Sequence, residues 1–304
     1  DPESLKASIE FGKNTAAAVW QYSVRDSIGH DAFMYNFDRN FRVDERKGCW
    51  KPEEGRPMPP LLPNWGHVRS FMVHTGDVAV RPPAPFDESA PSTFFSEAME
   101  VFSISQSLTS EDHWIAEFWS DDLPGLTISA TGRWISIANQ AVENAGLPFP
   151  VVMETYLKTA FALSDAAIIC WDTKYKYQVE RPDAFIRRNI KSSWSPLHPN
   201  PSFPSYPSGH AIFGAAAAEI LTAAFGQNYS LTDRTHQGRQ EFAGKPRSFR
   251  SFEEMANENA YSRVLIGVHF RMDCEEGLRV GKSIGQKIAA MSLQKEQVAV
   301  IRLK

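Results

Sequence analysis

Apolar residues recur at helical spacing along most of the chain, and proline-rich stretches interrupt this pattern. Between residues 4 and 37 the apolar positions predict one or two helices. Residues 41–92 are rich in proline and are expected to be largely irregular, although Trp50 and Trp65 are apolar enough to pack against a folded body. Helical spacing returns near Thr93. Breaks are predicted at 121–132 and 146–150, and a long helix from Val151 to Glu180.

Little in the pattern indicates strands, and no internal repeat is visible, so a mostly helical fold is expected. The 304 residues suffice for one large domain or two smaller ones. A hydrophobic fraction of 42% is typical of a globular protein, and no stretch offers the roughly 20 uninterrupted apolar residues of a membrane span. We therefore expect no membrane partner.

The formal net charge of −4 gives no support for a nucleic-acid partner, which usually requires a basic face. Cys49, Cys170 and Cys274 have neither metal-ligand spacing nor the pattern of a disulfide framework. The chain opens at Asp1 without a signal peptide, and we expect a mature periplasmic or secreted form.

Three segments of the C-terminal half concentrate residues with chemical potential. In WDTKYKYQVERP, Trp171, Lys174, Gln178 and Arg181 are spaced to line one face of a helix that ends at Pro182. A core-facing stripe does not carry two cations. Taken alone, however, such a stripe is more often a solvated helix face.

The second segment is PSFPSYPSGHAIFGAAAAEIL. Its prolines predict an extended approach, after which Ser208 can cap a helix running from Gly209 to Phe225. The free N–H groups at that helix start form an anion site, and His210 in the first turn can act as an acid or a base. A plain serine-capped helix is the alternative for this segment alone.

The third segment is SRVLIGVHFRMDCEEGLRVG. His269 and Asp273 are four residues apart, which on a helix lets the carboxylate accept from one ring nitrogen and leaves the other as a ligand or nucleophile. Arg263 precedes His269 by six residues, which places the two about 120° apart around an ideal helix. Arg263 can therefore reach the same site only through its long side chain or through a non-helical backbone at Ser262. Alone, this pair is more often structural.

Together the three segments resemble the signature of the superfamily that unites type-2 phosphatidic acid phosphatases, bacterial nonspecific acid phosphatases and vanadium haloperoxidases. That signature is K-x6-RP, then PSGH, then SR-x5-H-x3-D. The match covers about 100 residues, and the N-terminal half is similar only loosely. It runs through Lys174, Arg181, Pro182, Pro207, Ser208, Gly209, His210, Ser262, Arg263, His269 and Asp273, with every spacing intact.

The resemblance implies an all-α fold of two packed helical bundles within one domain, residues 1–304. The C-terminal four-helix bundle, about residues 151–292, would carry the active site, and residues 1–150 would form the N-terminal helical half. The roles that it implies also agree with the chemistry of the side chains. Three cations, Lys174, Arg181 and Arg263, would neutralise the oxygens of a tetrahedral oxyanion.

The remaining roles concern the central atom of that anion. Ser208 and the N–H of Gly209 would complete the cradle, and His269 would bond phosphorus in a phosphatase or vanadium in a peroxidase. Asp273 would set the tautomer of His269, and His210 would move protons on the opposite face.

The choice between phosphatase and peroxidase rests on two aromatic neighbours, because fold and motif are shared. Trp171 lies three residues before the motif lysine and Phe203 five before the motif serine, as in vanadium chloroperoxidases, where such residues shape the halide side. The two aromatics favour the peroxidase. As a whole, the chain resembles bacterial vanadium-dependent haloperoxidases of the iodoperoxidase kind, although no motif carries the choice of halide. The resemblance implies vanadate as cofactor. Hydrogen peroxide and a halide, iodide before bromide, would be its substrates, and an organic molecule would accept the hypohalous acid.

Two alternatives stay open. An acid phosphatase would hydrolyse phosphate monoesters through a phosphohistidine, and a binding protein without turnover would leave His210 and Asp273 without a role. A last prediction concerns the acidic turn at Asp121 and Asp122, whose carboxylates are candidates to orient a buried Arg263. The alternative is that both are solvated loop acids.

Overall fold

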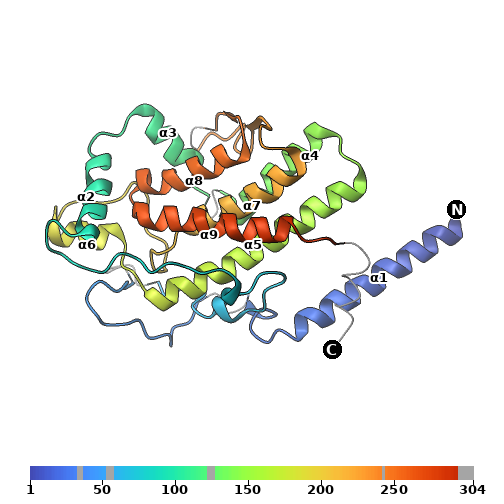
Figure 1. Cartoon of the computed structure of the whole chain (residues 1–304), viewed down its shortest axis with the longest axis horizontal. Coiled ribbons are helices and arrows are strands. Elements are labelled where there is room, and N and C mark those ends of the chain that lie inside the picture. The colour runs from blue at the N-terminus through green and yellow to red at the C-terminus, as the bar shows by residue number, and fades with distance from the viewer. Residues whose placement is uncertain (33–36, 53–57, 122–126, 242–243, 294–304) are drawn as a thin grey trace.

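The computed structural model describes residues 1–32, 37–52, 58–121, 127–241 and 244–293. Within these ranges the chain is mainly helical, which confirms the all-α prediction (Figure 1). None of the described helices is long and apolar enough to cross a membrane. The helices are α1 (Pro2–Val24), α2 (Thr93–Ser105), α3 (Ser110–Phe118), α4 (Ala130–Ala145), α5 (Phe149–Tyr177), α6 (Pro182–Asn189), α7 (Gly209–Phe225), α8 (Phe252–Ile266) and α9 (Arg271–Ala289).

Helix α7 forms the centre of the molecule and packs against α4, α5, α8 and α9 (Figure 1). Its sequence is apolar on almost every side, and twelve of its residues are buried. A helix that is hydrophobic all round is stable only when other elements enclose it, so α7 is the core of a bundle with α5, α8 and α9. Helices α2, α3 and α4 pack against this bundle.

The close packing of α7 on α9 depends on three glycines at every fourth position of α9. A Cβ added at Gly277 would lie 2.9 Å from the carbonyl oxygen of Ser208, and one at Gly281 would lie 2.3 Å from that of Ile212. The third, Gly285, meets the backbone of α7 in the same way. These glycines let the two backbones approach, and so they set the position of the α7 N-terminus.

The proline-rich segment packs against the body, as expected, instead of forming a loose linker. Trp50 and Val73 are buried, and the only regular structure between residues 58 and 92 is two short 3-10 turns, η2 (Trp65–His67) and η3 (Thr75–Asp77). The carboxylate of Asp165 on α5 accepts three backbone N–H groups, from residues 71, 72 and 73, at 2.7–2.8 Å. This buried carboxylate anchors the segment to α5.

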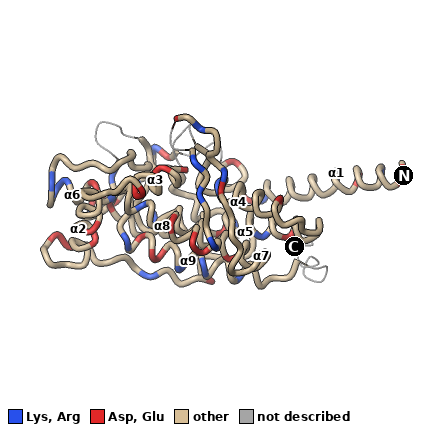
Figure 2. Tube along the Cα trace, turned by 90° about the horizontal axis from the view of Figure 1, so that it is seen from above, with Lys and Arg blue, Asp and Glu red and all other residues tan. Residues whose placement is uncertain are grey.

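Helix α1 differs from the other helices because none of its residues is buried. It projects from the body in both views (Figures 1 and 2). The helical pattern predicted for residues 4–37 is thus confirmed for α1, but its apolar positions do not face the core.

Three sequence expectations need correction. The long helix begins at Phe149 and ends at Tyr177, three residues before Glu180, because Gln178 adopts a left-handed conformation with φ of 50°. The break predicted at 121–132 lies two to three residues earlier, because α3 ends at Phe118 and Ser129 caps α4 at Ala130. Two short strands, β1 (Leu231–Asp233) and β2 (Arg247–Phe249), form an antiparallel pair that the pattern did not indicate.

Candidate active site

A cavity of about 490 Å³ lies at the N-terminus of α7. Seven of the predicted site residues line it: Asp121, Trp171, Phe203, Gly209, His210, Arg263 and His269. The rest of the wall is mostly apolar, with Leu61, Leu62, Trp65, Leu163, Ala167 and Phe213. The cavity is thus mainly apolar with a few polar groups on its wall, a composition typical of ligand sites.

Ser208 and Gly209 have the predicted helix-start geometry. Ser208 is the N-cap of α7, and its hydroxyl accepts the N–H of Ala211 at 3.5 Å. The N–H of Ser208 donates to the carbonyl of Asp273 at 2.9 Å, which ties the start of α7 to the start of α9. The first turn of α7, with Gly209 and His210, therefore faces the cavity with its positive dipole end.

His269 and Asp273 are in contact, although they do not lie on one helix as predicted. Helix α8 ends at Ile266 because Gly267 is left-handed with φ of +87°, and α9 begins at Arg271. His269 lies in the connection between them. Its Nδ1 is 2.9 Å from Oδ2 of Asp273, so the predicted pairing is formed by a loop and the first turn of a helix.

The electrostatics of this pair leave one imidazole nitrogen for a ligand. Burial, followed by the nearby cation Arg181, lowers the pKa of His269 well below its usual value, so the ring is neutral. With Nδ1–H donating to Asp273, Nε2 carries the lone pair, and Nη1 of Arg181 lies 3.1 Å from it. Burial raises the pKa of Asp273 to about 6.

Arg181 reaches the site from a position that the helical pattern did not predict. The chain leaves α5 at Gln178, and Arg181 becomes the N-cap residue of α6, where Pro182 takes the first helical position. Its guanidinium donates to the carbonyls of Val268 at 2.8 Å and of Phe203 at 3.0 Å. These bonds fix the fork beside His269.

Lys174 is fully buried, and it is held by the loop before α7. Its ammonium donates to the carbonyls of Pro204, Ser205 and Pro207 at 2.9, 2.8 and 2.6 Å. Burial lowers its pKa to about 7. Lys174 is not on the cavity wall, so it would have to release one of these carbonyls to reach an anion there. In this arrangement Lys174 fixes the conformation of the loop that precedes Ser208.

Arg263 lines the cavity, and Asp121 does not orient it as predicted. Its Nη1 donates to the backbone carbonyl of Trp119 at 3.1 Å. Asp121 is buried and takes a different guanidinium, that of Arg133, at 2.9 Å. The prediction that Asp121 pairs with Arg263 is therefore wrong, because Arg133 from the first turn of α4 occupies the carboxylate. Asp122 lies outside the described residues.

Trp171 and Phe203 form an aromatic wall, with ring centroids 5.1 Å apart. The indole N–H of Trp171 donates to the carbonyl of Leu61 at 3.2 Å, which fixes the ring. The ring of Phe203 also lies 5.0 Å from both the ammonium of Lys174 and the guanidinium carbon of Arg181. Phe203 thus contacts both cations while it lines the cavity.

Sequence reasoning missed Ser205, which is completely buried. Its hydroxyl donates to Oδ2 of Asp273 and lies 3.3 Å from Nδ1 of His269. The same carboxylate oxygen accepts the backbone N–H of Phe270 at 3.1 Å. A serine between two prolines, three residues before the motif serine, was the available signal. Its partner lies 68 positions further along the chain, a distance at which spacing carries no information.

Fold and site together define a helical protein with a cavity at a helix N-terminus, lined by His210, Arg263 and His269, with Arg181 in contact with His269. A family profile described as the second helical-bundle domain of VCPO matches residues 189–297. The vanadium-dependent bromoperoxidase of Corallina officinalis is 27% identical over 165 residues, 51% of this chain and 26% of its own. The vanadium chloroperoxidase of Curvularia inaequalis is 25% identical over 186 residues, 45% of this chain and 30% of its own.

Solved structures of bacterial vanadium-dependent haloperoxidases are also similar to this chain. A structure described as the first bacterial vanadium-dependent iodoperoxidase is similar with a TM-score of 0.80 and 30% identity, over 88% of this chain and 65% of that one. A holo bacterial vanadium-dependent chloroperoxidase shares the fold at a TM-score of 0.67 and 18% identity, over 83% of this chain and 64% of that one. In fold and motif, the chain is similar to vanadium haloperoxidases. It spans less than a third of these two curated relatives and about two thirds of the solved structures.

Proposed function

We propose that this protein binds vanadate and uses hydrogen peroxide to oxidise a halide. The observation that carries the proposal is the position of His269. This residue lines a cavity that also presents Arg263, the α7 N-terminus and the aromatic pair Trp171 and Phe203. The relatives' names, vanadium bromoperoxidase, chloroperoxidase and iodoperoxidase, support the same cofactor and reaction.

The residues present suit a vanadate ion. A neutral imidazole with one lone pair can bond the central atom, and Asp273 keeps the proton on the other nitrogen. Arg181 and Arg263 are buried cations that can donate to oxyanion oxygens, and the N–H groups at the start of α7 add neutral donors.

When bound, vanadium(V) would supply a Lewis acid that activates hydrogen peroxide toward halide attack. The chain's own residues would do the remaining work. Arg181 and Arg263 would hold the anion and offset its charge, and His269 would fix its position. His210 lies on the cavity wall at the start of α7, where its imidazole can accept a proton from peroxide or return one to a leaving oxygen. Trp171 and Phe203 would exclude water from the halide side.

The size of the cavity supports an organic acceptor close to the anion. At about 490 Å³ the cavity falls within the range of sites for small organic ligands, and it is far larger than a halide or peroxide requires. Its apolar side chains favour an apolar or aromatic acceptor of the hypohalous acid. We expect iodide to be oxidised most readily because it gives up electrons most easily, bromide more weakly, and chloride not measurably.

The test compares two activities of one protein preparation. Protein saturated with orthovanadate is expected to form triiodide from iodide and hydrogen peroxide, and the His269→Ala variant is expected to lose this activity while staying folded. His113→Ala, an exposed histidine on α3, is the matched control and should retain it. Hydrolysis of p-nitrophenyl phosphate without any halide oxidation would contradict the proposal and assign the chain to the acid phosphatases. Retained activity in His269→Ala would remove that residue from the role of ligand.

A further inference from the structure

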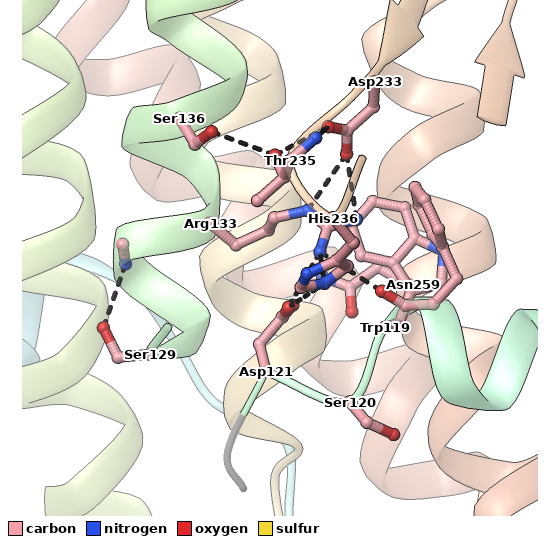
Figure 3. Close-up of polar contacts among 12 residues, drawn as sticks. Trp119, Ser120, Asp121, Ser129, Arg133, Ser136, Asp233, Thr235, His236 and Asn259 are labelled. Atoms are coloured by element: carbon pink, nitrogen blue, oxygen red, sulfur yellow. Dashed lines mark hydrogen bonds and ion pairs between the residues drawn. The ribbon is translucent and has the colours of Figure 1, made fainter. Parts of the chain in front are cut away.

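A second buried charge cluster lies beside the cavity, and the proposed reaction does not use it. Its centre is Arg133, in the first turn of α4, whose side chain is completely buried (Figure 3). Asp121 follows α3, and Asp233 ends β1. Both carboxylates lie 2.9 Å from the guanidinium. His236 also contacts Arg133, and its Nε2 lies 3.5 Å from Oδ1 of Asp121.

Arg133 links Asp233, which neighbouring side chains hold in place, to the segment 118–121 at the end of α3. On the Asp233 side, Oδ2 of that carboxylate accepts from Nε at 3.0 Å, while Oδ1 is held by the hydroxyl and N–H of Thr235 and by Gln140. On the segment side, Nη1 donates to the carbonyl of Phe118 at 3.2 Å and to Oδ1 of Asp121 at 2.9 Å. One planar fork therefore holds both ends of the segment 118–121.

The middle of that segment touches the anion site. The carbonyl of Trp119 accepts the hydrogen bond from Nη1 of Arg263 at 3.1 Å. Two further contacts keep this residue in place, because the guanidinium carbon of Arg133 lies 4.8 Å from the Trp119 ring and the indole N–H donates to Glu258 at 2.9 Å. The position of the Trp119 carbonyl, which is an acceptor for Arg263, is therefore set from both sides of the residue.

We infer that Arg133 is a positioning residue for the anion site and that it acts through the segment 118–121 on Arg263. Arg133 does not itself line the cavity, whereas Asp121 and Arg263 do. Loss of the fork would free the Trp119 carbonyl, and the Arg263 guanidinium would lose a fixed acceptor that orients it toward an oxyanion. The inference rests on the proposed function only in requiring that an oxyanion binds at this site.

The test is a double-mutant cycle in which the affinity for inorganic phosphate is measured by calorimetry. Arg133→Lys keeps the charge but cannot reach both carboxylates and the Phe118 carbonyl at once. It is expected to weaken phosphate binding about tenfold, which corresponds to the loss of one charge-assisted hydrogen bond. In an Arg263→Met background the same substitution is expected to change the affinity less than twofold, because the residue through which it acts is absent.

Two further variants keep the test decisive. Asp121→Asn leaves Arg133 in place and weakens only its contact with the segment 118–121. Its loss of phosphate affinity should be smaller than that of Arg133→Lys and should depend on Arg263 in the same way. This variant gives a result even if Arg133→Lys fails to fold. Asp165→Asn is the matched control, since Asp165 is an equally buried carboxylate that holds residues 71–73 and not the segment 118–121. It should reduce stability to urea and leave phosphate affinity unchanged in both backgrounds.

An equal loss of phosphate affinity in both backgrounds would overturn the inference, and so would unchanged affinity with reduced stability. Failure of the proposed function gives a different pattern. Phosphate affinity that depends on Arg133 through Arg263, in a protein without vanadate-dependent iodide oxidation, would uphold the positioning role and contradict the haloperoxidase. Vanadate-dependent iodide oxidation in a protein where the effects of Arg133→Lys and Arg263→Met on phosphate affinity are additive would support the haloperoxidase and contradict the positioning role.

Discussion

Replacing Gly281 by alanine tests the link between backbone packing and the anion site. The added Cβ would lie 2.3 Å from the carbonyl oxygen of Ile212 and 2.9 Å from Cβ of Ala215, both on α7. Ordinary contacts of this kind are about 1 Å longer for the carbonyl, and neither atom belongs to a flexible side-chain end. The two helices would therefore have to separate, which would move the start of α7 with Ser208 and His210.

The expected magnitude follows from two opposing terms. Alanine is favoured over glycine inside a helix by about 1 kcal/mol, whereas over-packing a core costs about 1–3 kcal/mol and occasionally more. Because Gly281 meets backbone, we expect the upper end of that cost and a net decrease of about 2 kcal/mol in the free energy of unfolding.

Urea unfolding followed by circular dichroism would measure this difference. Gly12→Ala on α1 is the matched control, because a Cβ at Gly12 meets nothing within 4 Å, and there the substitution should increase stability. Phosphate affinity should fall in Gly281→Ala and stay unchanged in Gly12→Ala. A Gly281→Ala protein as stable as the native one, with native phosphate affinity, would refute the view that the α7–α9 contact positions the site.

Three further predictions concern buried carboxylates. Ser205→Ala removes a hydrogen bond to Asp273 and should lower the free energy of unfolding by about 1.5–3 kcal/mol, measured in urea; no change would mean that the bond contributes nothing. Asp165→Asn places an amide N–H against backbone N–H donors, so a loss of about 2 kcal/mol is expected by the same assay, and native stability would contradict the anchoring role. Burial opposes the ionisation of Asp233, but Arg133 and the neighbouring donors outweigh it and lower the pKa of this carboxyl. The stability that Asp233 contributes is therefore present above about pH 4 and lost as the pH falls through its folded pKa, and Asp233→Asn should flatten the acid limb of a stability–pH curve.

The sequence analysis predicted local features well and spatial partners less well. The Ser208 cap and the span of α7 follow from local rules of helix starts and apolar content, and both are confirmed. The contact between His269 and Asp273 is also confirmed, but its backbone was predicted wrongly. A spacing of four residues fits a helix as well as a loop that enters the first turn of one, and Gly267 was the local sign of the break.

Contacts between distant segments could not be predicted from spacing. Asp121 was expected to orient Arg263, but the packing of α4 against α7 places Arg133 against its carboxylate instead. Lys174 was placed on the correct helix, but its three carbonyl acceptors come from a loop about 30 residues away. Such partners depend on the tertiary arrangement of elements whose order, but not whose geometry, is visible in the sequence.

The most direct test of the central claim is a crystal structure of the protein soaked with orthovanadate, with the metal located by its anomalous scattering. The account predicts a single vanadium atom bonded to Nε2 of His269, with its oxygens within hydrogen-bond distance of Arg181, Arg263 and the N–H of Gly209. Vanadium found elsewhere on the protein, or bound in this cavity without contact to His269, would contradict it.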